Sequence, residues 1–172
     1  MNKTYDVILV GAGPAGIFAA YELITKNPKL KVLLIEKGND IYSRNCPILQ
    51  KKATKCPNTK TGTCYPSCAM TSGFGGCGAY SDGKFNITSE FGGWMTDYLP
   101  DEEVLDLIKY VDSINLEHGA PKELTNPNTK EVFDIERRGI ARGLKLLRSE
   151  VRHLGTEINL QVLKNIYEDM LP

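Results

Sequence analysis

Three glycines with the spacing G-x-G-x-x-G, Gly11, Gly13 and Gly16, are the residues of this chain best suited to hold a ligand. Gly11 allows a tight turn, Gly13 lets the backbone approach a pyrophosphate, and Gly16 lets a helix pack closely on a strand. Pro14 suits the first turn of a helix, whose free N–H groups and dipole favour an anion. The pattern predicts a dinucleotide site.

The segments around the glycines have the order that such a site needs. The unalternated apolar run Val7–Val10 predicts a parallel strand buried on both faces, and a helix is expected from Pro14 to about Thr25. A second strand, Lys31–Glu36, ends in an acid that can accept from a ribose hydroxyl. The alternative is a glycine-rich strand-to-helix turn that binds nothing.

The chain changes character after Glu36. From about Gly38 to Ala69 it loses periodicity, and a second glycine-rich segment follows from Ser72 to Lys84. A nicotinamide-binding domain would continue with further strands and helices. Two glycine-rich loops therefore favour a longer, two-part ligand over NAD.

Composition narrows the class of protein. The chain has 172 residues, 41% of them hydrophobic, which allows one globular domain of ordinary size. Lys plus Arg and Asp plus Glu both number 21, so no basic excess indicates nucleic acid or an anionic membrane. The longest mostly apolar stretch, Val7–Ala20, is too short to span a bilayer. We expect a cytoplasmic protein that is not bound to a membrane.

Four segments together resemble the N-terminal part of a group of prokaryotic FAD-dependent dehydrogenases, in the glutathione-reductase-like FAD/NAD(P)-binding oxidoreductase superfamily. The segments are Tyr5–Gly16, Leu34–Gly38, Gly73–Lys84 and Arg152–Glu157. The resemblance implies an α/β fold, a Rossmann-like FAD-binding domain with a parallel strand-helix-strand core. It also implies FAD as the cofactor, with NAD(P)H as the candidate electron donor.

The resemblance assigns roles by position. Gly11, Gly13, Ala15 and Gly16 would contact the pyrophosphate, and Glu36 would hold the ribose, with Lys37 beside it. The flavin end would lie near the second glycine-rich loop, at Gly75, Gly76, Gly78, Ser81 and Asp82. No side chain is assigned a catalytic role, because the isoalloxazine ring carries the electron chemistry.

The resemblance also implies that the domain is incomplete at its C-terminus. A complete domain of this type needs a further group of strands and a Gly-Asp motif near its end. We expect an FAD-binding core over residues 1–98, a helical insertion over 99–155, and a helix over 156–172 that returns to the core. A C-terminal half or a partner chain would then have to complete it.

The insertion should contain two helices, from about Glu102 to Glu117 and from about Lys130 to Leu147. The second carries five basic residues, which give either a phosphate-binding face or a solvated one: Arg137, Arg138, Arg142, Lys145 and Arg148.

The five cysteines fit no standard metal signature. Cys56, Cys64 and Cys68 have the spacing C-x7-C-x3-C, with Cys46 before them and Cys77 in the second glycine loop. Reduced thiols are expected and no metal site is predicted, with a metal or iron–sulfur site formed by these cysteines as the alternative. Two rival functions stay open: an NAD-binding Rossmann module, and a catalytically silent fragment of a flavoprotein. The substrate cannot be inferred from these residues.

Overall fold

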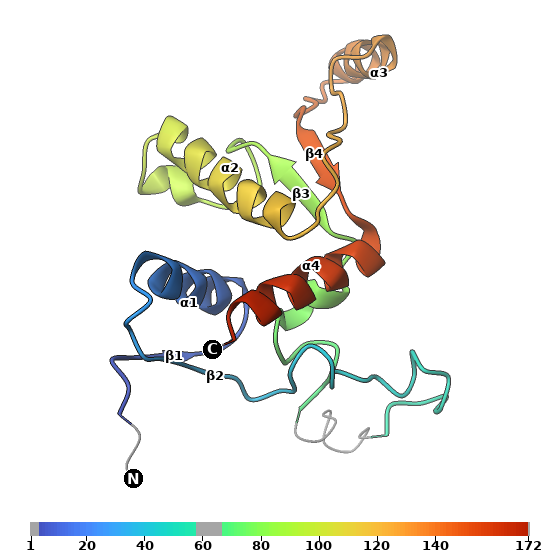
Figure 1. Cartoon of the computed structure of the whole chain (residues 1–172). Helices are drawn as coiled ribbons and strands as arrows, with labels where there is room; N and C mark the ends of the chain where they lie inside the picture. The colour runs from blue at the N-terminus through green and yellow to red at the C-terminus, as the bar shows by residue number, and fades with distance from the viewer. Residues whose placement is uncertain (1–3, 58–66, 172) are drawn as a thin grey trace. The chain divides into compact units, whose positions relative to one another are not determined.

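The protein is described by a computed structural model over residues 4–57 and 67–171. Its fold is α/β. The elements in chain order are β1 (Val7–Val10), α1 (Pro14–Lys26), β2 (Val32–Ile35), the 3-10 helix η1 (Gly76–Tyr80), β3 (Lys84–Ile87), the 3-10 helix η2 (Met95–Asp97), α2 (Asp101–Glu117), α3 (Lys130–Ile140), β4 (Glu150–His153) and α4 (Gly155–Asp169) (Figure 1).

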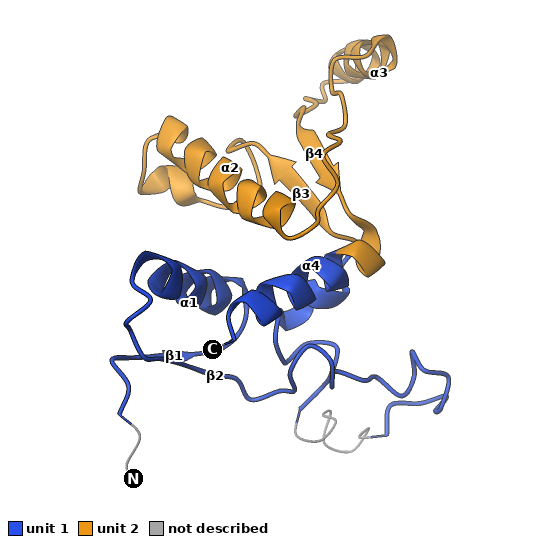
Figure 2. Ribbon diagram, viewed as in Figure 1, with its two compact units in different colours: residues 1–81, 159–172 blue, residues 82–158 orange. Residues whose placement is uncertain are grey.

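The chain forms two compact units (Figure 2). Residues 1–81 and 159–172 make up the first, and residues 82–158 the second. These units are defined by compactness and not by independent folding. The domain bounds expected from the sequence therefore stay a prediction.

The first unit contains the predicted strand-helix-strand element. β1 and β2 pair in parallel, from Val7 opposite Val32 to Val10 opposite Ile35, and α1 connects them. The helix lies very close to the first glycine turn, because a Cβ on Gly16 would be 1.9 Å from the carbonyl oxygen of Gly11. Both strands and the helix are therefore confirmed where the sequence predicts them.

The expectation that β1 is buried on both faces is wrong. Ile8 is 58% exposed and Val10 is 85% exposed, and Ile35 opposite Val10 is 45% exposed. Leu34 points to the other face, where its Cδ1 lies near Gly16 of α1. Among the described residues the sheet has two strands and one covered face, so its other face is open.

The second unit contains an antiparallel strand pair that the sequence analysis did not predict. β3 and β4 pair with Phe85 opposite Arg152, and α2 is joined to this pair by an ion pair. Arg152, which is 3% exposed, donates from Nε and Nη2 to the two carboxylate oxygens of Asp112, each at 2.6 Å. Its Nη1 donates to the carbonyl oxygen of Pro121 at 2.6 Å. Arg152 thus ties α2 and the chain after it to β4.

The expected helix over 130–147 is too long, because α3 ends at Ile140. Gly143 has a φ of 72°, and the N–H of Leu144 donates to the carbonyl oxygen of Gly139 at 2.9 Å, which reverses the chain. A left-handed glycine is a common way to end a helix. Arg148, expected on the helix, therefore lies beyond it.

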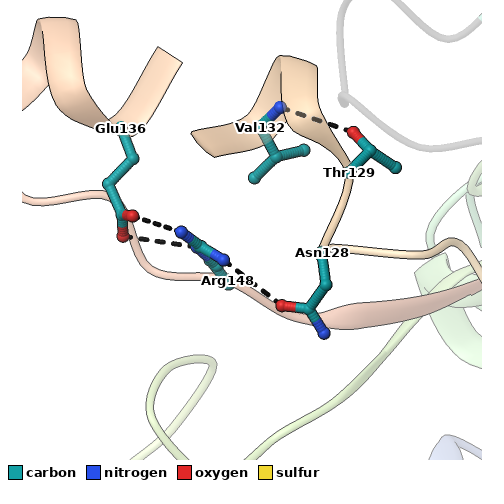
Figure 3. A network of polar contacts seen from close by, with 5 residues as sticks. All are labelled: Asn128, Thr129, Val132, Glu136 and Arg148. Atoms are coloured by element: carbon teal, nitrogen blue, oxygen red, sulfur yellow. Dashed lines mark hydrogen bonds and ion pairs between the residues drawn. The ribbon is translucent and has the colours of Figure 1, made fainter. Parts of the chain in front are cut away.

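Local contacts hold the start of α3 and its middle at Glu136 (Figure 3). Thr129 caps its start by accepting the N–H of Val132 at 3.4 Å, and the returning Arg148 pairs with Glu136 and donates to Asn128. The Arg148 guanidinium also lies over the ring of Phe133, 4.1 Å from its centre. The exposed sides of α3 and of the segment after it are rich in basic residues. A phosphate-binding face and a solvated face both stay predictions for this helix.

Candidate functional site

The first glycine turn has the geometry of a backbone cradle. Gly11 has a φ of 101°, and its N–H donates to the carbonyl oxygen of Ile35 at 2.7 Å. Gly13 is the N-cap of α1, with Pro14 in the first turn and no side chain capping the helix. A Cβ on Gly13 would meet nothing within 4 Å. The start of α1 therefore borders open space in which an anion can approach its N–H groups.

Glu36 joins three segments of the first unit. Its Oε2 accepts the N–H of Ala12 at 2.8 Å, and its Oε1 accepts the N–H groups of Gly38 and Gly73, each at 2.9 Å. Burial raises the pKa of Glu36, but these hydrogen bonds and the charge of Lys37 outweigh it and lower the pKa below its ordinary value. The group is an anion at neutral pH. A carboxylate has about four acceptor positions, so about one is left for a ligand hydroxyl.

The second glycine-rich loop lies directly against the first. The N–H of Gly75 donates to the carbonyl oxygen of Ala12 at 2.8 Å, and a Cβ on Gly76 would lie 3.5 Å from the Cα of Gly13. Gly75 and Gly76 have φ values of 89° and 58°, which favour glycine. Two loops separated by about 60 residues in the sequence thus form one surface.

Asn159 on α4, which the sequence analysis did not single out, holds η1 in place. Its side-chain Nδ2 donates to the carbonyl oxygens of Gly78 and Ala79, at 2.8 and 3.3 Å. The N–H of Ser81 also donates to the Gly78 oxygen, at 3.0 Å. Asn159 is 4% exposed, and an isolated Asn in an amphipathic pattern carries no signal that would reveal this contact.

The remaining expected site residues are exposed. Ala15 lies in the first turn of α1, and Lys37 follows β2. Ser81 is the last residue of its segment in the first unit, and Asp82 begins the second unit. The carboxylate of Asp82 pairs with Nζ of Lys84 at 2.8 Å, and this hydrogen bond lowers the pKa of Asp82.

Arg44 is a second residue that the sequence analysis did not identify. It is 3% exposed, and backbone carbonyl oxygens accept its hydrogen bonds: Phe74 at 2.6 Å, Ala69 at 2.9 and 3.0 Å, and Met70 at 3.2 Å. Its guanidinium also lies over the ring of Tyr80, 5.0 Å from the centre. Burial lowers the pKa of Arg44, although an arginine stays charged. Arg44 therefore fixes both sides of the turn that leads into the second glycine loop.

A hollow of about 300 Å³ lies beside Glu36 in the first unit. Its walls are mainly apolar, and Phe74 and Tyr167 meet there edge to face, with ring centres 5.0 Å apart. The space can hold a flat apolar group next to a carboxylate. The lining residues are Ala12, Leu34, Glu36, Gly38, Asn39, Asp40, Phe74, Tyr167, Met170 and Leu171.

The described cysteines are free thiols. They are Cys46, Cys56, Cys68 and Cys77, while Cys64 lies outside the described residues. A hydrogen bond from the backbone of Met70 is the main cause that lowers the pKa of Cys68. Within residues 4–57 and 67–171, no group of three or more His, Cys, Asp or Glu side chains is placed to hold a metal ion.

Comparisons with known proteins agree best over the N-terminal segment. The Thi4 family matches residues 2–41. The mitochondrial L-2-hydroxyglutarate dehydrogenase of Dictyostelium discoideum is 49% identical over 37 residues, 22% of this chain and 8% of that protein. The thiamine thiazole synthase of Coprinopsis cinerea is 52% identical over 33 residues, 19% of this chain and 10% of that protein.

A longer similarity covers most of the chain. An "uncharacterized protein" of Clostridium beijerinckii is 30% identical over 164 residues, 94% of this chain and 26% of that protein. The chain thus spans about a quarter of the length of this relative. No solved structure matches the chain.

The structure also bears on membrane association. None of the helices in the described part of the chain is both long enough and apolar enough to cross a bilayer. Residues 2–41, which the Thi4 family matches, include β1, α1 and β2 and the first glycine turn.

Proposed function

We propose that this chain forms the cofactor-binding part of an FAD-dependent oxidoreductase, with a Rossmann-like core. The observation that carries the proposal is the contact between the two glycine-rich loops. Gly75 donates to the carbonyl oxygen of Ala12, which lies between the two glycines of the first turn. A single backbone surface that continues beyond the start of α1 suits a ligand longer than one nucleotide.

The residues around the first turn fit a pyrophosphate. Gly13 leaves open space where a Cβ would point, and the first turn of α1 presents N–H groups and the positive end of a helix dipole. Gly11, Pro14, Ala15 and Gly16 complete this phosphate-binding turn in our proposal. Glu36 would accept from the adenosine ribose with its remaining acceptor position, and Lys37 lies next to it.

The second loop would face the flavin end of the cofactor. Gly76 lies beside Gly13, and Gly78, Ser81 and Asp82 follow it. Bound FAD would supply hydride or electron transfer, with a nicotinamide as the candidate donor. The side chains of this chain would bind and orient the cofactor.

The second glycine loop favours FAD over a nicotinamide as the resident cofactor. A nicotinamide-binding module gives no role to the second glycine loop, which here contacts the first. The dehydrogenase and the thiazole synthase that match the chain, together with the Thi4 family match at the N-terminus, support an oxidoreductase-type segment. The anionic Glu36 would also repel the 2′-phosphate of NADP.

We further propose that another polypeptide segment completes the domain. The exposed side chains of Ile8, Val10 and Ile35 form an apolar sheet face of the kind that α/β proteins cover on both sides. The Clostridium relative has about three quarters of its length outside the matched region. Residues that face the substrate would come from such a segment.

The free thiols suit the reducing cytoplasm, where we place the protein.

The test is a parallel titration with FAD and with NAD, followed by desalting and a visible absorbance spectrum. Our proposal predicts that the chain retains a flavin spectrum after desalting and binds NAD far more weakly. Retention of NAD without FAD would support the nicotinamide module. Failure to bind either cofactor, with a folded protein shown by circular dichroism, would support a silent fragment.

A further inference from the structure

A second hollow, of about 410 Å³, lies within the second unit. It is bounded by β3, by one side of α2 and by the segment over residues 88–96. Most of the wall is apolar. The main apolar contributors are Phe85, Ile87, Val104, Leu107, Ile108 and Val111.

Asn115 in this wall has a buried side-chain amide donor that no acceptor in the described part of the chain satisfies. It is 3% exposed, it lines the hollow, and its Nδ2 has no hydrogen-bond partner among the described residues. On α2 it continues the helical spacing of Val104, Ile108 and Val111. A buried polar side chain at a position of an apolar stripe is unfavourable unless an acceptor meets it.

The charged residues of the wall are already paired. Both carboxylate oxygens of Asp112 accept from Arg152, and Nζ of Lys84 pairs with Asp82 at 2.8 Å. Among the wall residues that the structure describes, no unpaired charge is thus left for an anionic or a cationic ligand. The wall suits an uncharged molecule.

We propose that this hollow binds an uncharged, largely apolar carbonyl compound whose oxygen accepts a hydrogen bond from Nδ2 of Asn115. The apolar side chains of α2 and β3 contact the body of the molecule, and the amide fixes its orientation. The residues concerned all belong to the second unit, so the inference does not depend on FAD binding in the first.

The test uses the full chain and two probes of similar size. 2-Acetylnaphthalene carries a carbonyl group, and 2-isopropylnaphthalene is a matched hydrocarbon without one. We expect saturable binding of the ketone by calorimetry, and a ratio of ketone to hydrocarbon affinity about tenfold higher than in a variant without the Asn115 amide, the factor that a neutral hydrogen bond supplies. The ¹H–¹⁵N signals of the Asn115 side chain should shift with the ketone and far less with the hydrocarbon.

Two variants separate the hydrogen bond from the apolar contact. Asn115→Leu should lower the ratio of ketone to hydrocarbon affinity about tenfold, because the donor is removed while the volume is kept. Leu107→Lys changes a wall residue that is 47% exposed, and it should weaken binding of both probes without unfolding the chain. The far-ultraviolet circular dichroism of each variant checks its fold.

Three results would overturn the proposal. The first is no saturable binding of the ketone to the native chain. The second is binding of the ketone that leaves the ¹H–¹⁵N signals of the Asn115 side chain unshifted. The third is a ratio of ketone to hydrocarbon affinity that is the same in Asn115→Leu as in the native chain.

Discussion

The carboxylate of Glu36 accepts the backbone N–H of Ala12 at 2.8 Å, so the residue that follows β2 holds the glycine turn that follows β1. The other oxygen of the same carboxylate accepts the N–H of Gly73, near the start of the second glycine-rich segment. One side chain thus positions both loops of the proposed cofactor site. Glu36 is a structural residue before any ligand is considered.

Replacing Glu36 with Gln should destabilise the first unit by about 1–3 kcal/mol at pH 7, because the amide places an NH₂ group against backbone donors. Urea unfolding followed by circular dichroism measures this loss. Glu22→Gln is the matched control, since Glu22 pairs with Lys26 on the surface, and it should cost less than about 1 kcal/mol.

The effect of Glu36→Gln should depend on pH in a defined direction. The pKa of Glu36 is lower in the folded chain than its ordinary value of 4.5, so the ionised group stabilises the fold fully above that value. This stabilisation is lost as the pH falls through the folded pKa. The difference between the native chain and the variant should therefore shrink below pH 4.5, and a constant difference would contradict the assignment.

Arg44→Met should loosen the turn before the second glycine loop. The change removes the hydrogen bonds to Ala69, Met70 and Phe74 and leaves their carbonyl oxygens without this partner, at a cost of about 2–4 kcal/mol. Hydrogen exchange of the backbone amides over 69–76 should accelerate. Arg44→Lys keeps the positive charge but lacks the several donors of the planar guanidinium. If its backbone amides over 69–76 exchange as slowly as in the native chain, the charge alone is sufficient and the account is contradicted.

The two glycines of the α1 turn should respond differently to alanine. A Cβ on Gly16 would lie 1.9 Å from the carbonyl oxygen of Gly11, so Gly16→Ala should lower the free energy of unfolding by about 2–3 kcal/mol. A Cβ on Gly13 would meet nothing within 4 Å, so Gly13→Ala should cost less than about 1 kcal/mol, the loss expected when Ala replaces Gly at an N-cap. Thermal unfolding without ligand compares them, and equal midpoints would contradict this packing.

The pair of Arg152 and Asp112 should behave as one buried unit. Either Arg152→Met or Asp112→Leu alone leaves an unpaired buried charge and should cost about 3–5 kcal/mol. The double variant should cost clearly less than the sum of the two. Additive losses in a double-mutant cycle would show that the pair contributes no coupling.

The parts of the fold predicted from sequence are those set by local patterns. The apolar runs and the glycine spacing predict β1, α1 and β2, because each signal lies within the element. The burial of Ile8 and Val10 was mispredicted because exposure depends on which other segments cover the sheet. α3 ends at Ile140 and not at residue 147, because Gly143 takes a left-handed conformation. The sequence alone does not show whether Gly139 or Gly143 does so.

Contacts between distant segments could not be predicted in the same way. Arg44 and Asn159 act on the carbonyl oxygens of residues 25 to 81 positions away, and a carbonyl acceptor is available at every residue. The meeting of Gly75 with Ala12 is likewise a result of the folded chain. The alternating residues of β3, Lys84–Ile87, carry a period of two that could have indicated a strand.

FAD titration of the native chain beside Gly13→Asp and Gly93→Asp tests the central claim most directly. Both glycines face open space without a left-handed φ, and Asp is a favoured N-cap at position 13, so both variants should fold. The account predicts that Gly93→Asp binds like the native chain, whereas Gly13→Asp binds at least about a hundredfold more weakly, because its carboxylate would face the pyrophosphate. Unchanged affinity in Gly13→Asp, or no binding by the folded native chain, would contradict the account.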